Sequence, residues 1–168
     1  MEAIKWSEET LNNMLTEPSA ALVEDLKRLE GDIMVLGAGG KMGPDICVLA
    51  KKASVLGGSD RKIYAVSRFS DAAAAERLRS HGVTVIAADL MDANALQALP
   101  DCKNIIYMAG RKFGTNGTEY LTWGMNAWLP CMVVQRFRQS NIVVFSSGNL
   151  YPKVSTASGG ATERVRTV

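Results

Sequence analysis

The feature that most constrains the fold is the glycine-rich stretch at residues 32–43. It opens with a short apolar run at 33–36 and then carries a glycine at every third position: Gly37, Gly40 and Gly43. An apolar helical face follows, and Pro44 suits the first turn of a helix, where its missing N–H costs nothing. The pattern predicts a strand, a tight turn and a helix.

Each glycine has its own role in such a turn. Gly37 lets the chain leave the strand sharply, and Gly43 lets the helix pack closely on the strand. Without a Cβ at Gly40, main-chain N–H groups can approach a pyrophosphate at the positive end of the helix. The predicted phosphate site comprises Gly37, Gly39, Gly40, Lys41, Met42 and Gly43. The alternative is a glycine-rich turn without a ligand.

The composition sets limits on the class of protein. The chain has 168 residues, of which 47% are hydrophobic and 21% charged, as expected for one globular domain with a sizeable core. A net charge of +2 is too small to indicate a nucleic acid or membrane-surface partner. No apolar run approaches the roughly 20 residues of a membrane span, and the first residues form no signal peptide. We therefore expect a cytoplasmic protein that binds neither nucleic acid nor membranes.

The cysteines are three, odd in number and far apart: Cys47, Cys102 and Cys131. The single histidine is His81. This spacing argues against a disulfide framework and against a Cys/His metal site, so we expect no metal. It predicts buried free thiols.

Residues 1–31 precede the first predicted strand. Helix starts are expected near Ser7 and Ser19, and the second helix carries an apolar face that ends at Gly31. We expect this helical extension to pack against the edge of the sheet. Docking of a partner protein is the alternative for its apolar face.

Strands and helices then alternate along the chain. The predicted strands cover 33–36, 62–67, 83–87, 104–108 and 141–145. The predicted helices cover 41–53, 71–81, 93–99 and 119–139. Strands this apolar are expected to be buried on both faces. The predicted fold class is α/β, a Rossmann-type doubly wound parallel sheet of about five strands, with a loop-like tail at 153–168.

In such sheets ligands bind beyond the carboxyl ends of the strands, so the residues after each strand are candidates. The second strand ends in Ser67 and Arg68, where NAD-selective folds place an acid. An arginine there can pair with a 2′-phosphate, which favours NADP over NAD as cofactor. Alternatively, Arg68 stacks on adenine without selecting NADP.

The third strand leads into Asp89 and Leu90. Asp89 is a candidate acceptor for the adenine amino group, and the alternative is that it caps a turn. Asp92 is the better candidate for capping the next helix.

The last two strands end in small or hydroxylated residues. The fourth is followed by Met108, Ala109 and Gly110, which leave room for a ribose and nicotinamide or simply form a tight turn. The fifth is followed by Ser146 and Ser147, whose hydroxyls can polarise a substrate oxygen, although paired serines are common in turns.

With these residues assembled, the chain resembles the extended short-chain dehydrogenase/reductase family, the NAD-dependent epimerase/dehydratase group. The resemblance covers residues 32–152. It rests on the glycine motif, Arg68, Ala88-Asp89-Leu90, Met108-Ala109-Gly110, Asn126 and 146–152. It implies a nicotinamide cofactor, a small-molecule substrate such as a sugar nucleotide, and a homodimer. It also implies that Ser147 takes the place of the catalytic Ser or Thr.

One family motif is missing. No tyrosine after Ser147 has a lysine four positions on, since Tyr151 is followed by Ser155. Family members are nearly twice as long, so we expect the 168 residues to be the cofactor-binding part of a longer oxidoreductase or isomerase, ending before the catalytic Tyr-x-x-x-Lys. The predicted parts are 1–31, 32–152 and 153–168. The alternatives are a dinucleotide-binding sensor or scaffold without turnover, and an α/β domain without a nucleotide.

Pro130 lies inside the predicted helix 119–139. Because proline has no N–H, the carbonyl of Asn126 loses its helical partner and the helix is expected to kink. In short-chain dehydrogenases a matching asparagine holds a water of the proton relay, which makes Asn126 a candidate support residue. The alternative is a kink that only curves the helix around the sheet.

Overall fold

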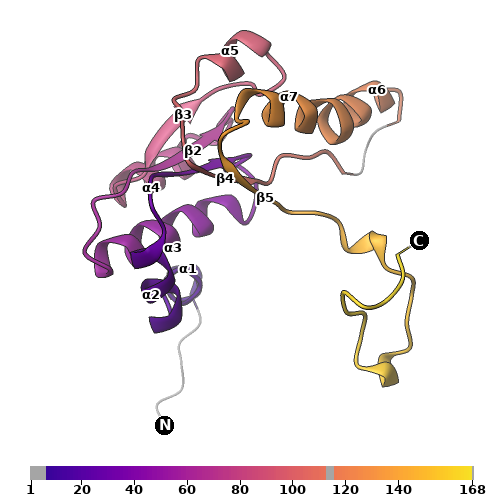
Figure 1. Ribbon diagram of the computed structural model, residues 1–168, viewed down its shortest axis with the longest axis horizontal. Coiled ribbons are helices and arrows are strands. Elements are labelled where there is room, and N and C mark those ends of the chain that lie inside the picture. Colours follow the sequence, from indigo (N-terminus) through magenta and orange to yellow (C-terminus); the bar gives the residue numbers. More distant parts are fainter. Residues whose placement is uncertain (1–6, 113–115, 168) are drawn as a thin grey trace.

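A computed structural model describes residues 7–112 and 116–167. Five parallel strands form one sheet in the order β3-β2-β1-β4-β5 (Figure 1). Their bounds are β1 (Ile33–Leu36), β2 (Ile63–Ser67), β3 (Thr84–Ala87), β4 (Asn104–Tyr107) and β5 (Asn141–Val144). The predicted α/β doubly wound fold is therefore confirmed, with each strand within two residues of its expected bounds.

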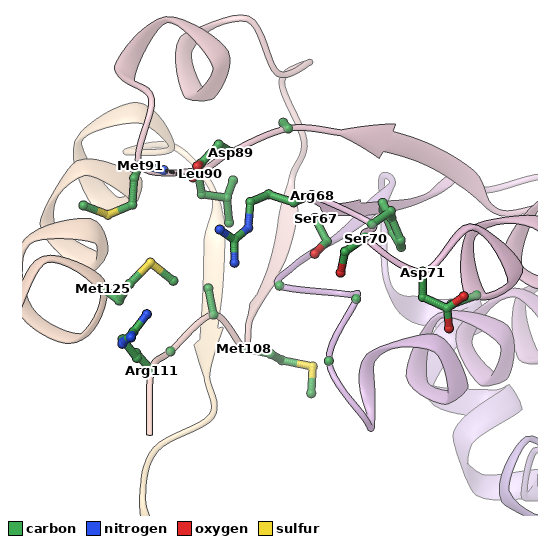
Figure 2. A pocket seen from close by; sticks show the side chains of 18 of the residues that line it. Ser67, Arg68, Ser70, Asp71, Asp89, Leu90, Met91, Met108, Arg111 and Met125 are labelled. Carbon is green, nitrogen blue, oxygen red and sulfur yellow. Dashed lines mark hydrogen bonds between the residues drawn. The ribbon is translucent and has the colours of Figure 1, made fainter. Parts of the chain in front are cut away.

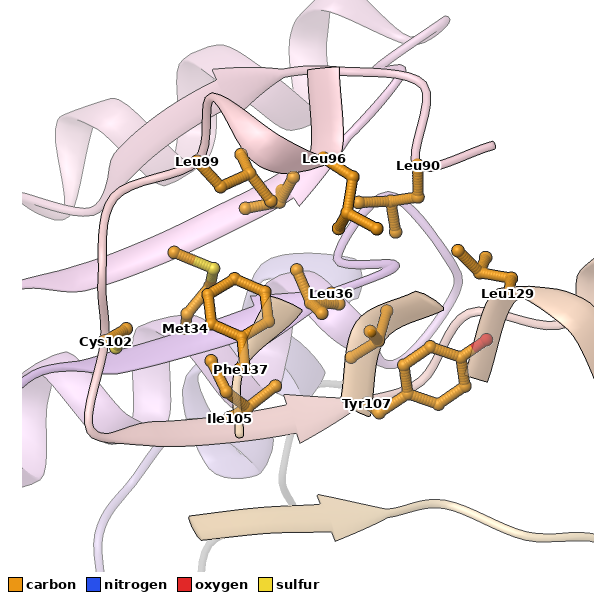
Figure 3. Close-up of a cluster of buried hydrophobic side chains, with 12 residues drawn as sticks. Met34, Leu36, Leu90, Leu96, Leu99, Cys102, Ile105, Tyr107, Leu129 and Phe137 are labelled. Atoms are coloured by element: carbon orange, nitrogen blue, oxygen red, sulfur yellow. The ribbon is translucent and has the colours of Figure 1, made fainter. Parts of the chain in front are cut away.

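Helices cover both faces of the sheet. One layer holds α3 (Gly43–Leu56) and α4 (Ala72–Ser80), and the other holds α5 (Ala93–Gln97) and α7 (Leu129–Arg136). Alternation along β1 explains the two layers: Ile33 and Val35 join one buried cluster, while Met34 and Leu36 join the other (Figure 3). The central strand is thus buried on both faces, as its apolar sequence predicts.

The edge strands differ from that expectation, because their side chains are not buried on both faces. Val143 and Val144 of β5 are 60% and 57% exposed, and the residues of β3 are exposed or half-buried. An edge strand has a neighbour on one side only, and both hydrophobic clusters are centred on β1, β2 and β4. An apolar sequence alone therefore did not distinguish an edge strand from a central one.

The N-terminal extension forms two helices, α1 (Glu8–Leu15) and α2 (Ala20–Arg28), capped as predicted by Ser7 and Ser19. Its expected packing against the sheet edge is wrong, because the extension lies on α3. The anchor is Arg61, a buried side chain that donates to the carbonyls of Leu26, Leu29 and Gly31. These carbonyls end α2 and need donors, and a guanidinium supplies several at once.

The long helix predicted at 119–139 is interrupted. It consists of α6 (Glu119–Trp123), a π-helical turn η1 (Gly124–Trp128) and α7. The N–H of Leu129 bonds to the carbonyl of Gly124, five residues back, just before Pro130. A residue without an N–H cannot continue the i→i−4 series, and the wider turn occurs beside it.

After β5 the chain runs away from the sheet and contains two short 3₁₀ turns, η2 (Gly148–Leu150) and η3 (Thr156–Ser158) (Figure 1). Among the helices of the described residues, none is long and apolar enough to cross a membrane.

The three cysteines are free. Cys47 and Cys102 are buried, and burial raises the pKa of the Cys47 thiol to about 12. The prediction of a buried thiol is wrong for Cys131, which is exposed. On α7 the residues two positions before and after it, Leu129 and Val133, face the core, so Cys131 points away.

Candidate functional site

A cavity of about 420 Å³ opens at the carboxyl ends of the central strands (Figure 2). Its volume lies in the range of small-molecule sites. Most of the predicted cofactor residues line it: Gly37, Gly39, Gly40, Ser67, Arg68, Asp89, Leu90, Met108, Ala109 and Gly110. The fold thus brings together residues from the ends of four strands.

Two glycines of the turn are required by the fold itself. Gly37 has φ +91°, and a Cβ there would lie 2.6 Å from the main-chain N of Ala109. A Cβ on Gly43 would lie 2.4 Å from the carbonyl oxygen of Ala38, where α3 packs on the turn. Both positions agree with the roles predicted from the sequence.

Gly40 differs from both. The nearest atom to a Cβ at this position would be the carbonyl oxygen of Gly37, at an ordinary contact distance of 3.5 Å. Packing therefore does not require glycine here, although the residue lines the cavity. A ligand lying against the turn would require it.

The turn also offers main-chain donors. Among the described residues, none accepts a hydrogen bond from the N–H groups of Gly39, Lys41 or Met42. Lys41, Met42 and Gly43 do not line the cavity, and the side chains of Lys41 and Met42 are exposed. Lys41 and Met42 can contribute to a phosphate site through these main-chain N–H groups.

The residues that follow β2 line the cavity with polar and aromatic side chains. The exposed side chain of Arg68 extends over the cavity (Figure 2) and forms no hydrogen bond or ion pair with the residues the structure describes. Ser67 packs on the turn, since a Cβ at Gly39 would lie 2.5 Å from its Oγ. Phe69 lines the cavity with φ +47°, a conformation uncommon outside glycine and typical of functional sites when it does occur.

The β3 exit is a tight turn. The Asp89 carboxylate accepts the N–H of Met91 at 3.0 Å, the turn-capping contact that was the alternative to an adenine contact. Asp92 caps α5 as predicted, accepting from the N–H groups of Asn94 and Ala95 at 2.8 and 3.4 Å. Leu90 is buried and forms the cavity floor together with the hydrophobic core.

The β4 exit is tied to the π-helical turn. Tyr107 donates from its hydroxyl to the carbonyl of Met125 at 3.3 Å, and burial raises the Tyr107 pKa to about 12. The Asn126 carboxamide accepts the N–H of Arg111 and donates to its carbonyl, both at 2.8 Å. The π-helical turn, a frequent feature of functional sites, thus holds the main chain of Arg111 in the loop after β4.

Ser147 lies apart from this cavity. It follows β5 in an exposed segment and does not line the cavity, and its carbonyl accepts the N–H of Leu150 at 3.3 Å. The structure does not bring Ser147 and the glycine turn together in one pocket. Its catalytic role stays a prediction.

Sequence reasoning missed several residues of the cavity wall: Phe69, Ser70, Asp71, Ala74, Met91, Arg111, Leu121 and Met125. Phe69, Met91 and Arg111 each follow a predicted strand-exit residue directly, so considering one more residue after each strand would have found them. Leu121 and Met125 carry no such signal, because only the packing of the helix over the sheet places them there. Within 7–112 and 116–167, no group of three or more His, Cys, Asp and Glu side chains is arranged to hold a metal ion.

Comparisons with known proteins define the class of fold. No protein-family model and no curated protein sequence matches the chain. Among solved structures, it is similar to ADP-L-glycero-D-manno-heptose-6-epimerase of Helicobacter pylori, with a TM-score of 0.64 and 15% identity over 87% of this chain. It is also similar to the UDP-N-acetylglucosamine 4-epimerase of Methanobrevibacter ruminantium in complex with UDP-N-acetylmuramic acid, with a TM-score of 0.59, 17% identity and 83% coverage.

A short-chain dehydrogenase/reductase superfamily protein of Agrobacterium tumefaciens with bound NAD matches 71% of the chain, with a TM-score of 0.50 and 19% identity. The chain spans 47%, 44% and 34% of the lengths of these three proteins. At such identities the likeness is one of fold. The resemblance to extended short-chain dehydrogenases/reductases is confirmed at that level: the chain has the Rossmann-type fold found in epimerases and in a member of that superfamily.

Proposed function

We propose that the chain is the NAD(P)-binding part of an epimerase/dehydratase-type oxidoreductase that acts on a sugar nucleotide or a similar hydroxyl or carbonyl substrate. The observation that carries the proposal is Gly40: it lines a cavity at the strand ends, and packing does not require its lack of a side chain. A dinucleotide pyrophosphate on the turn would require it. The proposed parts are 1–31, a helical extension, 32–152, the cofactor domain, and 153–168, a tail.

The residues divide by role. The N–H groups of Gly39, Lys41 and Met42, which have no acceptor among the described residues, would hold the pyrophosphate at the start of α3. Arg68 would bind a 2′-phosphate, which favours NADP, because it has no partner among the described residues and extends over the cavity. The bound nicotinamide would supply hydride transfer.

Ser147 would orient the substrate oxygen, and Asn126 would support a relay. The proton would be moved by a tyrosine outside these 168 residues, since none after Ser147 has a lysine four positions on. The missing motif also favours a second candidate, a dinucleotide-binding sensor without turnover. Hydride transfer between a panel of nucleotide sugars and the nicotinamide cofactor, measured with the full-length protein, distinguishes the two.

The test of cofactor binding is a fluorescence titration of the full-length protein with NADPH and NADH. Wild type is expected to bind NADPH, and Gly40→Val to lose binding while remaining folded by circular dichroism. A folded Gly40→Val variant with unchanged affinity would refute the phosphate site. Absence of binding by wild type would refute the function.

A further inference from the structure

The cavity has a second guanidinium. Arg68 and Arg111 both line the cavity (Figure 2). Arg68 follows β2 and Arg111 follows β4, and these strands lie on opposite sides of β1 in the sheet. The glycine turn leaves β1 between them. A ligand that lies across the turn would therefore meet Arg68 toward one end and Arg111 toward the other.

The main chain of Arg111 is held in place. Its N–H donates to the Asn126 side-chain oxygen and its carbonyl accepts from the Asn126 side-chain nitrogen, each at 2.8 Å. Asn126 belongs to the π-helical turn, which Tyr107 ties to the end of β4. Because this main chain is already fixed, binding a ligand does not have to order the loop that carries the Arg111 side chain.

The Arg111 side chain is poorly paired for a cation. One terminal nitrogen donates to the Thr118 hydroxyl at 3.1 Å, while its Nε is buried without a partner among the described residues. No described carboxylate forms an ion pair with it. A guanidinium has five N–H donors and a geometry that suits carboxylate and phosphate.

The acids of the cavity do not provide that partner. Asp71 accepts the N–H of Ala73 at 2.9 Å at the start of α4, and Asp89 accepts the N–H of Met91. Both lie on the β2–β3 side of the cavity. On the β4 side, near Met125 (Figure 2), Arg111 is the one charged side chain among the described residues that line the cavity.

We propose that Arg111 is a substrate-binding residue that receives an oxyanion, a phosphate or a carboxylate, of the substrate. This rests on the proposed function. With the pyrophosphate on the turn and the 2′-phosphate at Arg68, the nicotinamide half of the cofactor would bring no further anion to the β4 side of the cavity. The anion at Arg111 therefore belongs to the second ligand.

The test uses the full-length protein saturated with NADPH and isothermal titration with two probes, UDP and malonate. Wild type is expected to bind one of them, UDP if the substrate anion is a phosphate and malonate if it is a carboxylate. Arg111→Gln should weaken that probe about tenfold or more and leave the NADPH affinity within about twofold. Arg68→Gln is the matched control: it should weaken NADPH and, once the cofactor site is filled, leave the probe affinity unchanged.

Three results would overturn the proposal: neither probe binds wild type, both bind Arg111→Gln as well as wild type, or Arg111→Gln weakens NADPH as Arg68→Gln does. If Arg111→Gln does not fold, the probe affinity of Arg111→Lys is compared with that of wild type instead. Lysine keeps the positive charge but loses the two-pronged geometry of the guanidinium. An unchanged probe affinity of Arg111→Lys would then refute the proposal. Failure of the proposed function is seen separately, as loss of NADPH binding by wild type.

Discussion

Gly40 and Gly43 are three residues apart in one turn, yet alanine at the two positions should have different consequences. Gly43→Ala should lower the stability of the protein, and Gly40→Ala should lower its affinity for NADPH. At Gly43 a Cβ would lie 2.4 Å from the Ala38 carbonyl oxygen and 2.6 Å from its C and Cα, all main-chain atoms. Ordinary contact begins near 3.4 Å, so α3 must shift by about 1 Å, a strain that costs about 1–3 kcal/mol. In a domain of this size that corresponds to roughly 2–12 °C in melting temperature.

Gly40→Ala meets only one atom, at 3.5 Å, and its φ is not positive. It should leave the melting temperature unchanged or raise it slightly, because alanine restricts the unfolded chain by about 0.4–1 kcal/mol. Its methyl group would lie where the phosphates pass, so NADPH affinity should fall by about tenfold, or 1.4 kcal/mol.

The assay pairs differential scanning fluorimetry with NADPH titration on both variants. The expected result is a destabilised Gly43→Ala protein and a stable Gly40→Ala protein that binds poorly. The reasoning is refuted if Gly40→Ala loses stability as Gly43→Ala does, or if it retains full NADPH affinity.

Further predictions follow from single contacts. Arg68→Ala should weaken NADPH about ten- to a hundredfold more than NADH, and equal losses would mean that the side chain only stacks on adenine. Burial raises the pKa of Cys47 and of Tyr107 to about 12, so their contribution to stability is complete below pH 9 and is lost as pH rises toward 12. Tyr107→Phe should therefore flatten the alkaline decline in the free energy of unfolding above pH 10, and an unchanged slope in urea titrations would contradict this. Arg61→Met leaves three carbonyls without their donor and should lower the free energy of unfolding by about 2–4 kcal/mol. It should also expose the N-terminal extension to proteolysis, and a protease resistance equal to that of wild type would show that another residue anchors the extension. Pro130→Ala restores an N–H and should lower turnover of the full-length enzyme with little change in cofactor affinity; unchanged turnover would leave the proline a purely structural role.

Most of the fold was predictable because it depends on local patterns. The apolar runs, the glycines that end them and the capping residues act over a few positions, and Asp92 and Ser19 cap helices as the sequence indicates. The packing of the N-terminal helices was not predictable, because it depends on Arg61, which lies thirty or more residues away from the carbonyls to which it donates.

The residues of the candidate site were likewise predictable only in part. Residues within a few positions of a strand end, such as Arg68 and Gly110, were found because a parallel sheet places all its strand ends on one edge. Met125 and Leu121 were not found from the sequence, because no local pattern predicts which turn of a helix lies over that edge. Ser147 was assigned from the family resemblance, and the structure places it outside the cavity.

The sequence by itself determined the order of strands and helices along the chain, the glycine turn and the edge of the sheet at which a ligand would bind. Only the tertiary structure decided which of the three motif glycines are needed for packing. A Cβ on Gly37 would collide with main-chain atoms after β4, and one on Gly43 with the main chain of Ala38 in the same turn, whereas one on Gly40 would meet the Gly37 oxygen at an ordinary 3.5 Å. The reason is physical: a repeat of glycines specifies small residues, but whether the space beside each is filled by the protein or left to a ligand depends on how the turn folds back on itself and packs against the end of β4.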